Sequence, residues 1–253
     1  MILDLFRLDG KTAVVTGANT GLGQGLCIAF AQAGADVIGV ARRSMQQTKE
    51  QVEQTGRSFQ EIIVDLSQKD AVSCIMEACD KLCSRVDILV NNAGIILRED
   101  AKDVSEEDWD KVIQLNERLV FFLTQAMANR YFLPNKSGKV INIASMLSYQ
   151  GGIRVPAYAA SKSAVMGITK ALANEWASYG INVNAIAPGY MATNNTANLR
   201  KDADRSEAIL ERIPAGRWGT PEDLMGAGVY LASEASAYVN GFTLAVDGGW
   251  LAR

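Results

Sequence analysis

The sequence predicts an α/β protein made of one doubly wound, Rossmann-type domain, and three observations predict it. Short β-branched and apolar runs alternate along the chain with longer stretches whose apolar residues recur three and four positions apart. The short runs are apolar on both faces, which is typical of a parallel sheet that helices cover on both sides. The 253 residues, 48% hydrophobic and 21% charged, fit one globular domain without a linker or repeat.

The alternation predicts about seven strands joined by helices. We expect these strands at Thr12–Thr16, Val37–Val40, Ile62–Val64, Ile88–Val90, Val140–Ile143, Val183–Ile186 and Leu244–Val246. The clearest helical patterns are Ala71–Leu82, Trp109–Met127 and Ala164–Trp176. Two further helices have local start signals, because Ser105 lies three residues before Asp108 and Thr220 precedes Pro221.

The absence of histidine restricts the chemistry more than any other feature of the composition. It excludes Ser-His-Asp and Cys-His catalysis, histidine-ligated zinc and histidine proton relays. Acid–base chemistry must therefore use tyrosine, lysine, aspartate, glutamate or cysteine. A formal net charge of −3 without a basic block argues against nucleic acid as the main partner.

Neither the cysteines nor the apolar segments point to a metal site or a membrane. Cys27, Cys74, Cys79 and Cys83 include no CxxC pair, so we expect reduced thiols and no metal. The start, MILDLFRLDG, has no basic region followed by an apolar run, unlike a signal peptide. The longest charge-free stretch, Ile181–Leu199, is interrupted by asparagines, a proline and a glycine. We therefore expect a cytoplasmic protein that does not bind a membrane.

A glycine-rich turn follows the first expected strand and opens an apolar helix. Its glycines, Gly17, Gly21 and Gly23, have the spacing GxxxGxG rather than the standard GxGxxG of dinucleotide-binding proteins. Any tight turn favours glycine, so the motif alone is weak. Its place in the first strand–helix unit favours a turn that admits a pyrophosphate to the helix N-terminus.

The end of the second strand should select between NAD and NADP. A carboxylate there would bind the ribose 2′-hydroxyl of NAD and repel the 2′-phosphate of NADP. Asp36 begins the strand and so faces the opposite edge of the sheet, whereas the strand ends in Arg42 and Arg43. These guanidiniums could bind the phosphate of NADP, or could be solvated charges or stack on the adenine.

Tyr158 and Lys162 are the best candidates for acid–base catalysis. They lie four residues apart, on one face of an expected helix. A nearby ammonium stabilises phenolate, so Lys162 is expected to lower the pKa of Tyr158 from its usual value of about 10. Ser145 follows the fifth strand and precedes Tyr158 by thirteen residues. A YxxxK pattern alone is common by chance.

With its other motifs, the chain resembles the short-chain dehydrogenase/reductases over essentially its whole length. The motifs are TGANTGLG (16–23), Asp65, NNAG (91–94), Asn116, Ser145, YAASK (158–162), PGYMAT (188–193) and VDGG (246–249). The resemblance implies a single dinucleotide-binding and catalytic domain in which Tyr158 is the general acid/base. It further implies that Lys162 lowers the tyrosine pKa, Ser145 binds the substrate oxygen and Asn116 holds a water.

The resemblance also implies a nicotinamide cofactor, NAD(H) in the family's sugar-acid members, with NADP(H) suggested by Arg42. Asn91 could instead mainly tie strands together. The residues implied in cofactor binding are Gly17, Asn19, Gly21, Leu22, Gly23, Arg42, Asp65, Leu66, Asn91, Ala93, Gly94, Tyr158, Lys162, Pro188, Gly189 and Thr193.

Within this family the segments 98–101, 145–158, 187–196, 212–219 and 246–253 are similar to those of sugar-acid dehydrogenases. Such a substrate carries one carboxylate, which suits arginine, and several hydroxyls, which suit amides. Arg154 is the first candidate for the carboxylate, followed by Arg98 and Arg217, and a surface ion pair is the alternative for each. The other expected substrate contacts are Ser145, Gln150, Tyr158, Tyr190, Asn194 and Asn195.

Residues 190–214 break the strand–helix rhythm and are expected to form a substrate lid, because ligands bind beyond the carboxyl ends of such strands. The resemblance also implies a homotetramer. Two other functions stay open: a ketoacyl or other carbonyl reductase of the same family, and a dinucleotide-binding regulator without catalysis. The presence of Asn116, Ser145, Tyr158 and Lys162 favours an enzyme.

Overall fold

A computed structural model describes residues 1–253 and contains one parallel sheet in the order β3-β2-β1-β4-β5-β6-β7. All seven predicted strands are present and all neighbouring pairs are parallel. Their bounds are β1 Thr12–Thr16, β2 Asp36–Ala41, β3 Phe59–Ile63, β4 Ile88–Asn91, β5 Gly138–Ile143, β6 Ile181–Pro188 and β7 Thr243–Val246. The predicted α/β fold is therefore confirmed.

The strand β3 begins three residues before the predicted run of Ile62–Val64. It lies at one edge of the sheet, where Gln60 and Ile63 are exposed. Two polar residues, Gln60 and Glu61, follow Phe59, so the apolar run marks only the end of the strand.

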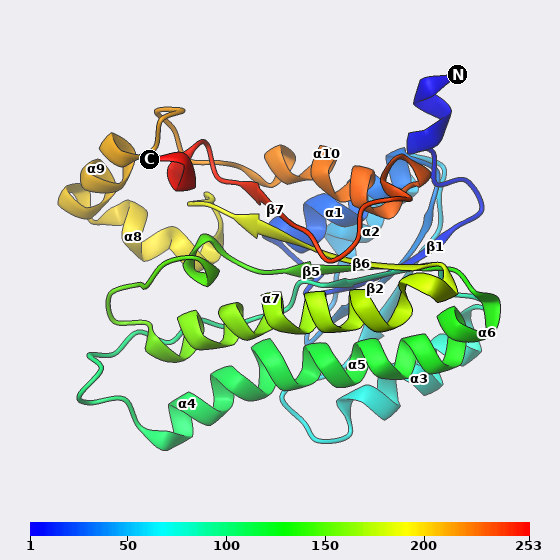
Figure 1. Cartoon of the computed structure of the whole chain (residues 1–253), viewed down its shortest axis with the longest axis horizontal. Coiled ribbons are helices and arrows are strands. Elements are labelled where there is room, and N and C mark those ends of the chain that lie inside the picture. Colours follow the sequence, from blue (N-terminus) through cyan, green and yellow to red (C-terminus); the bar gives the residue numbers. More distant parts are fainter.

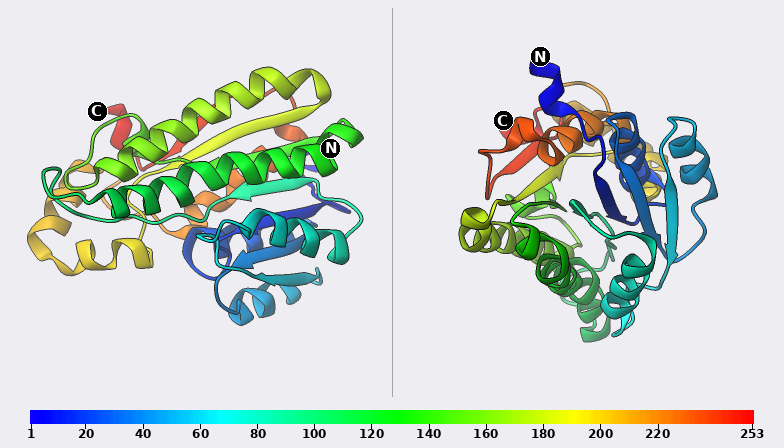
Figure 2. Two further views of the ribbon diagram at one scale, coloured as in Figure 1. Left: turned by 90° about the horizontal axis from the view of Figure 1, so that it is seen from below. Right: turned by 90° about the vertical axis from the view of Figure 1, so that its right-hand side faces the viewer.

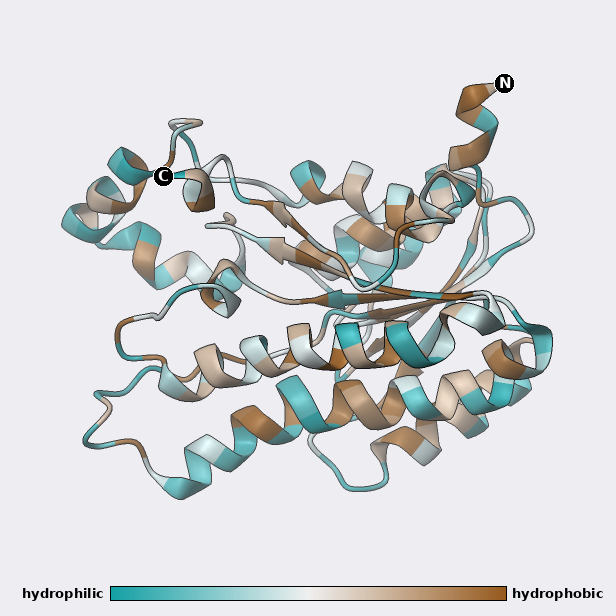
Figure 3. Ribbon diagram, viewed as in Figure 1, coloured by the Kyte–Doolittle hydropathy of each residue, from teal (hydrophilic) through white to brown (hydrophobic).

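Helices cover both faces of the sheet, as Figures 1 and 2 show. One face packs against α1, α2 and α10, and the other against α3, α5 and α7. Figure 3 shows the strands as the brown, apolar centre of the molecule. These helices are α1 Gly21–Gln32, α2 Gln46–Glu53, α10 Pro221–Ala232, α3 Ala71–Leu82, α5 Leu119–Met127 and α7 Pro156–Trp176.

The predicted helix Trp109–Met127 is longer and less regular than the sequence pattern suggests. It runs from α4 (Glu106–Ile113) through a π-helical turn at Gln114–Arg118 into α5. A second π-helical turn, Ala128–Phe132, leads to α6 (Leu133–Asn135). The predicted helix is present, but its two π-helical turns were not predicted, because apolar periodicity does not reveal a single inserted residue in a turn.

The helix α7 begins at Pro156, eight residues before the predicted Ala164. Proline suits the first position of a helix because its missing N–H would have no partner there. Tyr158 and Lys162 consequently lie in the first two turns of α7, at the end that faces the carboxyl edge of the sheet (Figure 1).

The direction of winding reverses between β1 and β4, and such a point opens a crevice at the carboxyl ends of the strands. Two short helices, α8 (Ala197–Lys201) and α9 (Ala203–Arg212), follow β6 and lie beyond this same edge (Figure 1). None of the helices has the length and hydrophobicity needed to span a bilayer.

Candidate active site

The turn between β1 and α1 leaves the N-terminus of α1 free of side chains. Gly17 and Gly21 have positive φ values of 68° and 60°, a conformation that residues with a Cβ rarely adopt. At Gly23, an added Cβ would overlap the carbonyl oxygen of Gly17 and lie 2.5 Å from Nδ2 of Asn92. The backbone amides of this turn can thus be approached closely by an anion. The cradle fits the pyrophosphate of a dinucleotide.

Thr16 and Asn92 join this turn to the segment after β4. The hydroxyl of Thr16 accepts hydrogen bonds from the amides of Asn92 and Ala93, both at 3.0 Å. The amide group of Asn92 donates to the Thr16 carbonyl at 2.8 Å. These bonds fix the floor of the crevice next to the glycine turn.

Asn91 is buried and ties strands and helices together. Its Nδ2 donates to the Asn142 side chain on β5 and to the Thr124 hydroxyl on α5, both at 2.8 Å. Both N–H groups of the amide are therefore used within the protein. For this side chain the structure favours strand tying, the alternative that the sequence left open.

At the carboxyl end of β2, Arg42 and Arg43 are exposed. Asp36 lies at the opposite end, where it accepts hydrogen bonds from Arg57 at 2.7 Å and from the Ser58 amide at 2.9 Å. Asp65 accepts bonds from Ser67, which lower the pKa of its carboxyl, and the charge of Arg42 acts in the same direction. Arg42 and Asp65 thus share one end of the crevice, and no carboxylate follows β2 directly.

The other expected cofactor residues lie along the same edge. Asn19 is partly buried in the glycine turn, Leu22 packs against the core under it, and Leu66 is buried beside Asp65. The segment that follows β6 lies against the glycine turn. A Cβ on Gly21 would lie 3.5 Å from the methyl group of Thr193, and the Gly189 amide donates to Val246 at 3.0 Å. Pro188 ends β6 and precedes this loop.

Ser145, Tyr158 and Lys162 are brought together at the end of β5. Lys162 is buried, and its ammonium donates to the Ile143 carbonyl at 2.6 Å. Its Nζ lies 5.8 Å from the centre of the Tyr158 ring. Ser145 is buried and its hydroxyl accepts from the Leu147 amide at 3.1 Å. This cluster can exchange a proton with a substrate oxygen placed between the Ser145 and Tyr158 hydroxyls.

Burial dominates the electrostatics of this cluster. It raises the pKa of Tyr158, while the Ser145 hydroxyl and the charge of Arg98 act in the opposite direction. It lowers the pKa of Lys162 to about 8. The expectation that Lys162 brings the tyrosine pKa below its ordinary value was therefore wrong for this structure. The physical reason is that the cost of a buried phenolate exceeds the stabilisation that the neighbouring groups supply.

Asn116 is fully buried in the first π-helical turn. Its Oδ1 accepts from the Ile95 amide at 2.9 Å, and its Nδ2 donates to the Ile95 carbonyl at 2.9 Å and to the Ser161 hydroxyl at 3.2 Å. The π turn thus aims this side chain at the segment after β4. A Cβ on Gly94 would lie 3.1 Å from Asn116 Oδ1 and 3.6 Å from Lys162 Nζ, so Gly94 adjoins the catalytic cluster.

Arg154, the first candidate for a substrate carboxylate, is paired with carboxylates of the protein. Its Nε lies 2.8 Å from Asp100 and its Nη2 lies 3.6 Å from Glu99. Arg154 therefore forms a surface ion pair, the alternative to binding a substrate carboxylate. Arg98, the next candidate, does not take its ion-pair alternative: it has no carboxylate within 4.0 Å, and its Nη2 donates to the Asn195 carbonyl at 3.4 Å.

The segment around α9 contacts the residues after β5 through a small apolar cluster. It consists of Met146, Ile209, Ile213 and Trp250, with Tyr190 and Trp218 packed against it. The Arg212 guanidinium lies 4.1 Å from the centre of the Trp250 ring and donates to Gln150 at 3.3 Å.

Sequence reasoning missed Arg205, Arg212 and Trp250. The charges of Arg205, Arg212 and Arg98 all act on Tyr190, lowering a pKa that burial raises. Of these three arginines only Arg98 was a candidate from the sequence, since Arg205 and Arg212 lie on an ordinary polar helix. Asn194 and Asn195 are exposed at the start of the lid.

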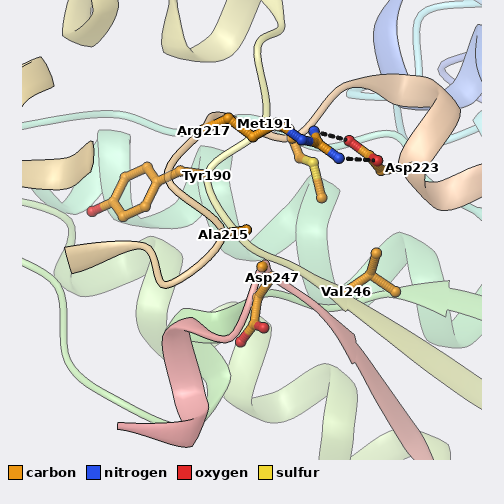
Figure 4. A pocket seen from close by; sticks show the side chains of 9 residues that line it. Tyr190, Met191, Ala215, Arg217, Asp223, Val246 and Asp247 are labelled. Atoms are coloured by element: carbon orange, nitrogen blue, oxygen red, sulfur yellow. Dashed lines mark hydrogen bonds and ion pairs between the residues drawn. The ribbon is translucent and has the colours of Figure 1, made fainter. Parts of the chain in front are cut away.

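Arg217 lies away from the catalytic cluster. Its guanidinium forms two hydrogen bonds of 2.7 Å with Asp223, and these lower the pKa of that carboxyl far below its usual range. Figure 4 shows this pair beside a cavity of about 160 Å³, with the Tyr190 ring directed away from the pair. Arg217 therefore also forms an ion pair within the protein, the alternative to binding a substrate carboxylate.

A family model described as enoyl-(acyl carrier protein) reductase matches residues 17–251. The 2-dehydro-3-deoxy-D-gluconate 5-dehydrogenase of Escherichia coli K12 is 58% identical over 253 residues, covering 100% of both chains. The chain belongs to the short-chain dehydrogenase/reductase family. It is a nicotinamide-dependent oxidoreductase, and the resemblance drawn from the sequence motifs is confirmed.

Solved structures agree with this membership. A protein of Agrobacterium tumefaciens, provisionally described as a 2-deoxy-D-gluconate 3-dehydrogenase and solved with bound NADP, is 54% identical with a TM-score of 0.92, covering 98% of this chain and 99% of its own. A gluconate 5-dehydrogenase of Burkholderia cenocepacia, in complex with NADP and tartrate, is 36% identical with a TM-score of 0.94 and covers 100% of both chains.

Proposed function

We propose that the protein interconverts a ketone and a secondary alcohol on a six-carbon sugar acid, as a 2-dehydro-3-deoxy-D-gluconate 5-dehydrogenase. The observation that carries this proposal is the meeting of Ser145, Tyr158 and Lys162 with an unpaired arginine, Arg98, at one crevice. The name of the Escherichia coli relative, 58% identical over its whole length, supports it.

Side chains of the protein would supply and remove the proton that the ketone oxygen gains or loses. A bound nicotinamide supplies the hydride in reduction and accepts it in oxidation. In reduction the Tyr158 hydroxyl donates its proton to the ketone oxygen, which becomes the alcohol, and Ser145 hydrogen-bonds that oxygen. The Lys162 ammonium favours the phenolate that remains, and Asn116 would hold a water through which the proton is replaced.

Arg98 is the better candidate for the substrate carboxylate. Arg154 and Arg217 are occupied by Asp100 and Asp223, whereas the guanidinium of Arg98 meets only a main-chain carbonyl of the lid. The charge of Arg98 also acts to lower the pKa of the Tyr158 hydroxyl, which supports this choice. A carboxylate bound there would contact both the body and the lid. Gln150, Tyr190 and Asn194 would serve the hydroxyls.

For the cofactor we propose NADP(H). Arg42 and Arg43 follow β2, where a 2′-phosphate would lie, and Asp36 faces the opposite edge. Solved relatives with bound NADP support this choice over the NAD(H) that the sequence resemblance implied. A homotetramer in the cytoplasm is likewise a proposal.

The experiment follows absorbance of reduced nicotinamide with 2,5-diketo-3-deoxygluconate, offered with NADPH and with NADH. We expect turnover with NADPH, and a loss of about 10²–10⁴-fold in Tyr158→Phe with unchanged NADPH affinity. Turnover of a ketoacyl thioester alone would overturn the sugar-acid substrate. Tight dinucleotide binding without turnover of any ketone would favour a regulator.

A further inference from the structure

Arg154 stands out in its backbone as well as its side chain. Its φ is 63°, and Lys136 is the only other residue besides glycine with a positive φ. Such a conformation is unfavourable for a side chain with a Cβ and persists only where surrounding contacts hold it. The contacts around Arg154 all come from one short segment, residues 99–100.

These contacts involve both the main chain and the side chain. The Glu99 amide donates to the Arg154 carbonyl at 3.0 Å. The guanidinium reaches Glu99 at 3.6 Å and Asp100 at 2.8 Å. The Glu99 carboxylate also accepts the Asp100 amide at 2.9 Å, so both carboxylates are turned toward Arg154. The segment after β4 is thereby joined to the segment that leads into α7.

These ion pairs affect Arg98, the residue that directly precedes Glu99 and Asp100 in the chain. Arg154 engages both of their carboxylates. A protein carboxylate on Arg98 would compete with a substrate carboxylate for the same donors. With Arg154 in place, Arg98 has no carboxylate partner and its charge acts on Tyr158 and Tyr190.

We propose that Arg154 is a positioning residue that engages Glu99 and Asp100 and so keeps Arg98 free for the carboxylate of the substrate. This inference rests on the proposed function, because it needs an anionic substrate at Arg98. It assigns Arg154 no contact with the substrate. The three side chains act as one unit, so the effect of each depends on the others.

The test compares Arg154→Ala in two backgrounds, the native chain and the Glu99→Gln/Asp100→Asn variant. In the native chain we expect the KM for 2,5-diketo-3-deoxygluconate to rise about tenfold, with kcat and the KM for NADPH within about twofold. In the variant without the two carboxylates, the same substitution should change the sugar-acid KM less than about twofold. Any long-range effect of removing two negative charges cancels in this comparison.

An Arg154→Ala effect of equal size in both backgrounds would show that Arg154 contacts the substrate itself and would overturn the proposal. Arg154→Gly repeats the test if the alanine variant does not fold, because glycine adopts a positive φ without strain. Hydrogen exchange at the Glu99 amide is independent of the substrate. Unchanged exchange in both Arg154 variants would contradict the proposal, whereas faster exchange without sugar-acid turnover would locate the failure in the proposed function.

Discussion

Gly23 is the residue at which the cofactor cradle depends most directly on the absence of a side chain. A Cβ there would overlap a carbonyl oxygen of the turn, whereas at Gly226 on α10 it would meet nothing within 4 Å. We expect Gly23→Ala to cost about 1–3 kcal/mol of stability and to weaken NADPH binding. The matched variant Gly226→Ala should gain about 0.5–1 kcal/mol and bind NADPH normally. Equal thermal stability and NADPH affinity in the two variants would contradict this account.

Lys162 is a buried charge whose proposed role is in catalysis and whose burial costs stability. Because its pKa in the fold is about 8, below its unfolded value, the cost of burying the charged form is fully present below pH 8. That cost declines as the pH rises from 8 toward the unfolded value. We therefore expect Lys162→Met to lose activity but to melt at a higher temperature than the native chain at pH 7.

The difference in melting temperature between Lys162→Met and the native chain should decrease between pH 8 and pH 10, because the native lysine loses its proton in the folded state over this range. Thermal melts followed by circular dichroism at pH 7 and pH 9.5 measure it. A difference in melting temperature that grows with pH would have the wrong sign for a buried ammonium.

At the level of elements, α9 is held to the body by the C-terminal turn. Trp250 packs against Ile209 and Ile213, and Arg212 lies over its ring. We expect Trp250→Ala to increase trypsin cleavage at Arg205 about tenfold and to raise the sugar-acid KM, since a lost core contact of this kind costs several kcal/mol. Tyr238→Ala, at an exposed aromatic, is the control. Equal cleavage in both variants would mean that the tail does not anchor the lid.

The sequence predicted those features of the site that depend on local geometry. The glycines of the first turn and the spacing of Tyr158 and Lys162 act within one turn or one helix, so the sequence places them without knowledge of distant partners. The position of α7 could also have been drawn from Pro156, a proline at a helix start.

Features that depend on distant partners were not predictable. The π-helical turn that aims Asn116 is held by Ile95, a residue 21 positions away. Arg154 is engaged by carboxylates more than fifty positions earlier, which left Arg98 rather than Arg154 free. Neither apolar periodicity nor charge pattern contains such pairings, since they arise only when the carboxyl ends of the strands meet.

At the scale of the whole molecule, we propose that one crevice binds NADPH at the glycine turn, a sugar acid at Arg98, and the ketone oxygen at Ser145 and Tyr158. The measurement that tests it most directly is the fate of the hydride. The protein would be supplied with 2,5-diketo-3-deoxygluconate and with NADPH that carries deuterium at both hydrogen positions of nicotinamide C4, and the product would be analysed by NMR. We expect one deuterium at C5 of 2-dehydro-3-deoxygluconate and none elsewhere. Deuterium at C2, or a product without deuterium, would contradict the account.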